Sequence, residues 1–143
     1  MIPSQNLLLS LPKTDLHVHL DGSLRLETLI ELSREQKCEL PSTTPEGLQE
    51  LVFKATYANL GEYLKGFGYT CAVMQDPESL ARVAYELAWD NINEGVRYIE
   101  VRFAPQLHMR PDFSCQEVLD AVNSGLEQAQ KEFSASDAVR KNG

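Results

Sequence analysis

The stretch LPKTDLHVHLDGS, residues 11–23, has the pattern of a β-strand that ends in a turn, and it decides the fold class. Ionisable residues hold one parity of this stretch and aliphatic residues hold the other: Asp15, His17, His19 and Asp21 against Leu16, Val18 and Leu20. Because side chains two positions apart on a strand point to the same face, we expect one polar and one aliphatic face. A polar strand face fits the mouth of a parallel barrel, where functional groups project at the carboxyl ends of the strands.

Helical patterns follow this strand. Apolar residues recur at helical spacing over about 26–37, and Thr44 before Pro45 resembles the N-cap of a short helix that runs to about Phe53. The segment NLGEYLKGFGYTCAVMQ, residues 59–75, carries a helical apolar stripe that glycines interrupt at three positions. Each glycine costs roughly 1 kcal/mol of helix propensity, so this helix needs support from its packing partners.

A second strand lies further along the chain. Asp76-Pro77-Glu78 opens a helix that Gly95 ends, and residues 96–104 then alternate as a strand. Ser114 and Glu117 form a capping box for a helix that continues to Phe133. Strands separated by helices imply parallel pairing with right-handed crossovers.

The fold class we expect is α/β. We interpret the chain as the N-terminal portion of a (β/α)8 TIM barrel, with extra helices between the first two strands. A complete barrel takes roughly 250 residues, so residues 1–143 form the N-terminal part of a single barrel domain in this interpretation, and the chain is incomplete.

Composition restricts the classes of partner. The formal net charge is −8, from 21 acidic and 13 basic residues, and no basic cluster is evident. Such a chain repels phosphates and anionic lipids, so we expect a small-molecule partner, no nucleic acid and no membrane. Three widely spaced cysteines and an N-terminus without a sustained apolar run favour a cytoplasmic location.

The pair His17 and His19 is a candidate metal site. Two imidazoles on one strand face lie nearly 7 Å apart by strand rise and can converge on one ion. Neutral imidazole suits zinc and other first-row divalent ions, and bound zinc lowers the pKa of a coordinated water to about 7. The alternative is that both histidines are polar residues on a solvent-facing strand.

Three segments resemble one known family in the right order. PKTDLHVHLDGS, residues 12–23, is similar to the amino-terminal signature of adenosine deaminases, which belong to the metal-dependent amidohydrolase superfamily. NLGEYLKGFGY, residues 59–69, resembles the helical flap over the nucleoside, and EGVRYIEVRFAP, residues 94–105, resembles the second barrel strand.

The resemblance implies a role for particular residues. His17 and His19 would be two ligands of a single zinc ion, and His19 and Asp21 would lie near the ribose, with Asp21 accepting a hydrogen bond from a sugar hydroxyl. The stripe of the flap would form the apolar wall of the pocket: Leu60, Tyr63, Leu64 and Phe67. Ordinary core packing is the alternative for this stripe, although the glycines favour a mobile lid.

The implied activity is zinc-dependent hydrolytic deamination of adenosine and deoxyadenosine to inosine and deoxyinosine plus ammonia, in purine salvage. The remaining metal ligands and the catalytic Glu and His of the family have no match here, so no catalytic residue is assigned, and we expect the 143-residue segment alone to be inactive. One alternative is a deaminase of adenine or another 6-aminopurine derivative, with AMP less favoured. Another is a non-catalytic partial-barrel module. The H-x-E and P-C-x-x-C motifs of cytidine deaminases do not occur in the sequence.

Two further expectations concern charged residues near the second strand. Glu100 and Arg102 share a strand face, so we expect a structural ion pair or a network with Asp15 inside the barrel. His108 follows the strand in a loop, and we expect it to be exposed, because loops run over the surface; the alternative is that it approaches the mouth of the barrel.

Overall fold

The computed structural model describes the backbone of residues 3–142 and the side chains of residues 3–136. Residues 1, 2 and 143 of the expected domain lie outside the described part. The elements are, in order, α1 (Gln5–Ser10), β1 (Lys13–His19), α2 (Leu26–Gln36), α3 (Pro45–Leu51), α4 (Leu60–Ala72), α5 (Pro77–Asn93), β2 (Val96–Arg102), the 3-10 turn η1 (Pro105–Leu107) and α6 (Cys115–Asn142).

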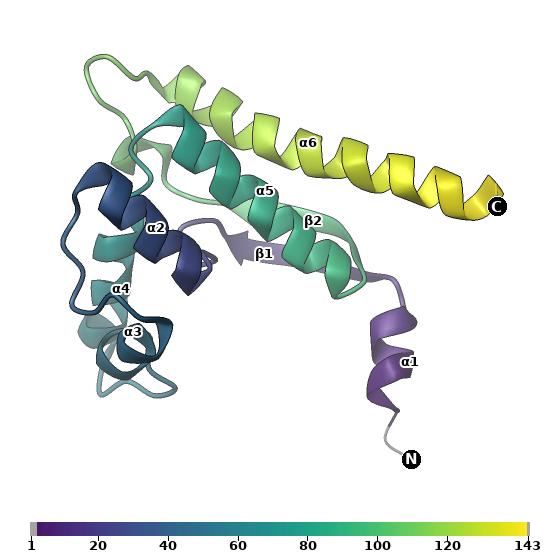
Figure 1. Cartoon of the computed structure of the whole chain (residues 1–143), viewed down its shortest axis with the longest axis horizontal. Coiled ribbons are helices and arrows are strands. Elements are labelled where there is room, and N and C mark those ends of the chain that lie inside the picture. The colour runs from purple at the N-terminus through teal and green to yellow at the C-terminus, as the bar shows by residue number, and fades with distance from the viewer. Residues whose placement is uncertain (1–2, 143) are drawn as a thin grey trace.

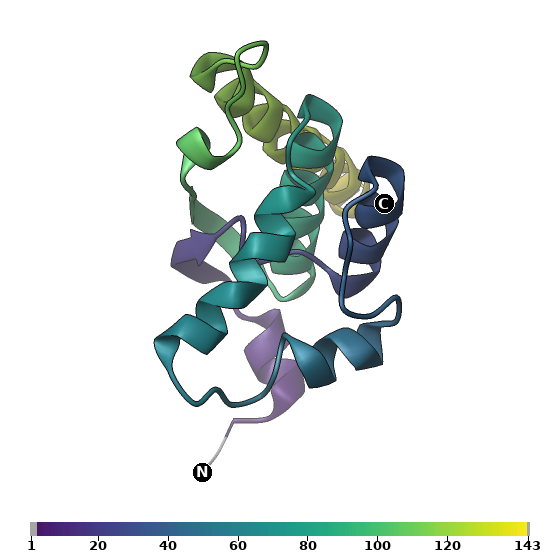
Figure 2. The ribbon, with the colours of Figure 1, turned by 90° about the vertical axis from the view of Figure 1, so that its left-hand side faces the viewer.

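The helices divide between two regions around a pair of strands. α5 and α6 lie side by side along the strands, and α2, α3 and α4 gather at the end toward which β1 points (Figure 1). Figure 2 looks onto this end, where α4 runs between β1 and the pair α2 and α3. Within the described residues, no helix has both the length and the apolar character needed to span a bilayer.

β1 and β2 pair in parallel, as the strand–helix–strand order predicts. The pairing advances from Asp15–Ile99 to Val18–Val101, so three steps along β1 match two along β2. β1 therefore carries a β-bulge opposite Glu100, and a second register shift lies between Lys13 and Thr14.

The bulge corrects the expected alternation of β1. Asp15 is half-buried together with Val18, whereas Leu16 is 57% exposed beside the exposed His17. After the extra residue, the side chains point to the face opposite to the one that regular alternation predicts, because a slip of one residue exchanges the two faces of a strand. His17, the second residue of the bulge, and His19, two positions later, are both exposed.

The opposite face of the strands covers the core. Val18 and Val101 pack against a buried cluster to which α2, α3, α5, α6 and the segment just after α4 contribute, for example Leu29, Met74 and Leu80. α6 approaches α5 most closely at Gly125, where an added Cβ would lie 2.1 Å from the carbonyl oxygen of Ala81. This contact requires glycine, because any side chain would overlap the α5 backbone.

The predicted helix starts are confirmed by their capping bonds. The side chain of Thr44 accepts from the N–H of Gly47, and that of Asp76 accepts from the N–H of Ser79 at 2.8 Å. Glu117 accepts from the N–H of Ser114 at 2.7 Å, which completes the capping box. Gly95 has φ of +85° after α5, as a helix-ending glycine often does. α6 continues past Phe133 to Asn142, since neither glycine nor proline occurs after Gly125 until Gly143.

Candidate functional site

The imidazoles of His17 and His19 lie together at the carboxyl end of β1. Their ring centroids are 5.2 Å apart and the rings are tilted by 49°, so both imidazoles lie on the same side of the strand. His17 is one of the two bulge residues, and bulges near functional sites redirect side chains locally. In the part of the chain that the structure describes, no group of three or more potential His, Cys, Asp or Glu ligands exists, so the pair supplies two donors for an ion.

Asp21 lies directly beyond the pair and is 6% exposed. Its Oδ1 atom is 3.6 Å from the Nδ1 atom of His19, whose side chain is half-exposed. At 3.6 Å the two groups are in contact without a hydrogen bond, and this contact is on the Nδ1 side of the ring, away from Nε2. The two imidazoles fit a divalent ion such as zinc, which His17 and His19 would hold.

A small cavity separates Asp21 from α4. Its volume is about 60 Å³, and it is lined by residues of α4 and of the segments before it, among them Asp21, Phe53, Tyr57, Tyr63, Phe67 and Thr70. Tyr63 packs edge-on against both Tyr57 and Phe67, at 5.2 and 5.6 Å between ring centroids. The cavity thus combines aromatic rings with one buried carboxylate, that of Asp21.

The four predicted wall residues divide into two groups. Tyr63 and Phe67 line the cavity, whereas Leu60 and Leu64 are 69% and 49% exposed and lie outside it. The residues of α4 that are buried are Gly66 and Thr70. Core packing within the described residues therefore does not account for the apolar stripe, because the core-facing side of α4 is a different one.

His108 corrects a sequence-based expectation. Its side chain is fully buried rather than exposed, and its Nδ1 atom lies 2.8 Å from the carbonyl oxygen of Met74. Burial lowers the pKa of His108, while the bond to Met74 and the charge of Asp21 act in the opposite direction. A contact with Met74, in the segment that follows α4, holds this loop inward, and no local sequence pattern predicts it.

The expected buried ion network of Glu100 and Arg102 is also wrong. Both side chains are exposed, and among the described residues Glu100 accepts a hydrogen bond from Tyr98 at 3.0 Å instead of pairing with Arg102. Asp15 accepts from the backbone N–H of His17 at 3.5 Å. The second strand ends with its charges on the same open face as the histidines.

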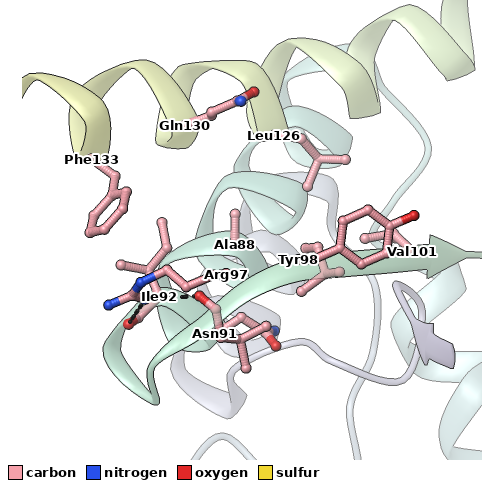
Figure 3. Close-up of a pocket in the computed structure, with 11 residues that line it drawn as sticks. Ala88, Asn91, Ile92, Arg97, Tyr98, Val101, Leu126, Gln130 and Phe133 are labelled. Atoms are coloured by element: carbon pink, nitrogen blue, oxygen red, sulfur yellow. Dashed lines mark hydrogen bonds between the residues drawn. The ribbon is translucent and has the colours of Figure 1, made fainter. Parts of the chain in front are cut away.

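The larger hollow of the molecule lies elsewhere. A groove of about 430 Å³ runs between α5, β2 and α6, where Leu126, Gln130 and Phe133 of α6 stand over the strand (Figure 3). The guanidinium of Arg97 lies 4.8 Å from the ring centre of Phe133 and donates to the carbonyl oxygens of Ile92 and Val96. No histidine, cysteine or carboxylate lines this groove, so the chemistry of the chain lies at the other end of the strands.

The sequence is similar to known proteins over most of its length. Residues 12–140 match the profile of the family described as Adenosine deaminase. An adenosine deaminase from Vibrio vulnificus (strain YJ016) is 44% identical over 124 residues, which are 86% of this chain and 38% of that relative. An adenosine deaminase from Clostridium perfringens (strain SM101 / Type A) is 43% identical over 125 residues, which are 87% of this chain and 38% of that relative.

Solved structures share the fold. An adenine deaminase from Arthrobacter aurescens matches with a TM-score of 0.72 at 23% identity, over 84% of this chain and 36% of that chain. An N6-methyl-AMP deaminase from Arabidopsis thaliana matches with a TM-score of 0.63 at 27% identity, over 87% of this chain and 35% of that chain. A zinc-bound amidohydrolase from Burkhoderia ambifaria matches at 0.73 and 21% identity, over 91% and 35% of the two chains. Because the family profile spans nearly the whole sequence and two bacterial relatives are 43–44% identical to it, the chain belongs to the adenosine deaminase family.

Proposed function

We propose that the full-length protein that carries this chain is a zinc-dependent deaminase in purine salvage. It hydrolyses adenosine and deoxyadenosine to inosine and deoxyinosine, with release of ammonia. The chain spans 38% of the length of its bacterial relatives, so we further propose that it forms the opening portion of a (β/α)8 barrel. The observation that carries the proposal is the convergence of His17 and His19 at the carboxyl end of β1.

The metal would be held here by His17 and His19, and further ligands would come from the rest of the protein. A zinc ion at such a site supplies a Lewis acid that makes water nucleophilic near neutral pH. The contact of Asp21 with Nδ1 of His19 supports this role, because it leaves Nε2 free to bind. The zinc-bound amidohydrolase of the same fold supports it at the level of the fold.

The residues of the chain itself bind and enclose the substrate in this proposal. Asp21 is a buried acceptor, and a hydrogen bond from a sugar hydroxyl to a carboxylate is strong because it is charge-assisted. Tyr63 and Phe67 cover the Asp21 cavity and exclude water from it. Leu60 and Leu64, on the same helix as Tyr63 and Phe67, provide exposed apolar surface for the purine ring.

The metal assignment is tested by zinc content. The full-length protein should contain about one zinc per chain, and His17→Ala and His19→Ala should each lose most of the metal and nearly all turnover. Leu16→Ala is the matched control, because Leu16 lies beside His17 on the exposed side of the bulge and has no ligand atom. Full zinc content in both histidine variants would contradict the assignment.

The substrate is tested by a screen of adenosine, deoxyadenosine, adenine, AMP and N6-methyl-AMP, in which ultraviolet absorbance reports deamination. We expect the two nucleosides to be the preferred substrates. Preference for AMP or N6-methyl-AMP would favour the function of the Arabidopsis neighbour instead, and preference for adenine that of the Arthrobacter neighbour. The 143-residue chain alone should not turn over any of them, because it supplies two metal donors; turnover by it would overturn the proposal of a shared barrel.

A further inference from the structure

His108 and Asp21 hold two buried polar atoms that lack partners. Nε2 of His108 and Oδ1 of Asp21 are both buried, and within the described residues neither has a hydrogen-bond partner. His108 is fully buried and Asp21 is 6% exposed. Since a buried polar atom without a partner destabilises the folded state, two of them in one region call for a shared explanation.

Both groups meet the same end of α4. Asp21 lines the cavity together with Thr70 in the last turn of α4, and His108 bonds to Met74, which follows the helix two residues after its end. Gln75 fixes the loop of His108 there by donating to the carbonyl oxygens of Cys71 and Leu107, at 2.7 and 3.1 Å. The charge of Asp21 also acts on the pKa of both His108 and Cys71, which agrees with this proximity.

The hydrogen-bond chemistry defines what can join the two atoms. A carbonyl oxygen only accepts, so Nδ1 of His108 must donate to Met74, and Nε2 of the neutral ring is left as an acceptor. The Oδ1 atom of the Asp21 carboxylate is an acceptor as well. Two acceptors are satisfied together by a group that donates twice, and water is the group of that kind that fits between buried atoms.

We propose that His108 is a positioning residue for Asp21: a water molecule that donates to both Nε2 of His108 and Oδ1 of Asp21 fixes the carboxylate for the sugar hydroxyl of the substrate. This inference rests on the proposed function for its role in substrate binding. It adds a residue outside the strand motif to the recognition of the ribose, and the bond to Met74 keeps the ring from turning.

Two conservative variants separate the bridge from the anchor. The amide of Asn in His108→Asn can replace Nδ1 and keep the bond to Met74, but nothing replaces Nε2. His108→Gln places an amide near the Nε2 position and loses the Met74 bond. Gln75→Ala loosens the same loop through Leu107 without touching Asp21, and serves as a structural control.

Kinetics with adenosine analogues, each lacking one sugar hydroxyl, give the first test in the full-length protein. Asp21→Asn identifies the hydroxyl that Asp21 binds. This variant should lower kcat/KM for every analogue except the one that lacks that hydroxyl. His108→Asn should lower kcat/KM for adenosine roughly tenfold, mostly through KM, and leave that same analogue nearly unchanged. His108→Gln and Gln75→Ala should affect all analogues equally. An equal loss on every analogue, or no loss, for His108→Asn would overturn the proposal.

Histidine-selective 15N NMR gives a test that needs no turnover and no folded His108 variant. His108 should be a neutral ring protonated on Nδ1, and Asp21→Asn should shift its Nε2 resonance whereas Gln75→Ala should not. A proton on Nε2, or an Nε2 resonance that ignores Asp21→Asn, would overturn the bridge. If the wild type deaminates no analogue while these NMR results hold, the proposed function fails and the bridge stands.

Discussion

Replacing Gly125 with alanine should destabilise the protein, although alanine is the better helix former. The new Cβ would lie 2.1 Å from the carbonyl oxygen of Ala81 and 3.0 Å from the backbone nitrogen of Tyr85. Both atoms belong to the α5 backbone and cannot rotate away, so α5 and α6 must separate by about 1 Å, and overpacking of this kind costs typically about 1–3 kcal/mol.

The net effect follows from two opposed contributions. Relief from glycine in a helix interior returns about 1 kcal/mol, so with overpacking at the upper end of its range we expect a net loss of about 2 kcal/mol. The melting temperature of the full-length protein should fall by about 3 °C, because the entropy of unfolding grows with the length of the chain. Thermal unfolding followed by circular dichroism measures this shift.

Gly68→Ala is the matched control. Gly68 lies inside α4, and nothing stands within 4 Å of its added Cβ. The same substitution should therefore raise the free energy of unfolding here by up to about 1 kcal/mol. If Gly125→Ala proves as stable as the wild type while Gly68→Ala behaves as expected, the close approach of α5 and α6 is refuted.

Three further changes probe other contacts. Asp76→Ala removes the acceptor for the N–H of Ser79 and should lower the free energy of unfolding by about 1–2 kcal/mol in urea titrations; an unchanged midpoint would contradict the cap. The ammonium of Lys54 and the N–H of Ala58 lower the pKa of Glu62, so its stabilising effect is present above the ordinary pKa of about 4.5 and is lost as the pH falls through the lower folded value. Thermal melts of the wild type and Glu62→Gln should therefore converge toward acid pH, and a constant difference would exclude this linkage. Leu64→Ala should change stability by less than about 1 kcal/mol, because Leu64 is 49% exposed, but should raise the KM for adenosine; an unaltered KM would remove Leu64 from the pocket wall.

Features set by neighbours in the sequence could be predicted, and features set by distant partners could not. The caps at Thr44, Asp76 and Ser114 depend on a residue three positions away, and all were predicted. The burial of His108 depends on Met74, 34 positions earlier, and the bulge of β1 depends on β2. A one-dimensional pattern carries no information on such pairings.

In the candidate site, too, the sequence predicts the residues but not the contacts between distant ones. The residues His17, His19 and Asp21 were selected from the sequence, and the structure adds that the two rings lie together and that Asp21 faces His19. Their roles toward metal and substrate stay predictions. The four wall residues were treated as one stripe, yet helix geometry sends Tyr63 and Phe67 toward the cavity and leaves Leu60 and Leu64 outside it.

The bulge in β1 has a consequence for how this strand tolerates change. By absorbing one residue between Asp15 and Val18, it separates the phase of the strand's first half from that of its second. Substitutions before the bulge can thus change the contacts of β1 with α1 or with the turn at Gly95, while the imidazoles of His17 and His19 keep their direction. Deleting Leu16 would join the two halves in a single phase, with His17 alone opposite Glu100, and Asp15, Val18 and Leu20 would keep the side opposite the histidines.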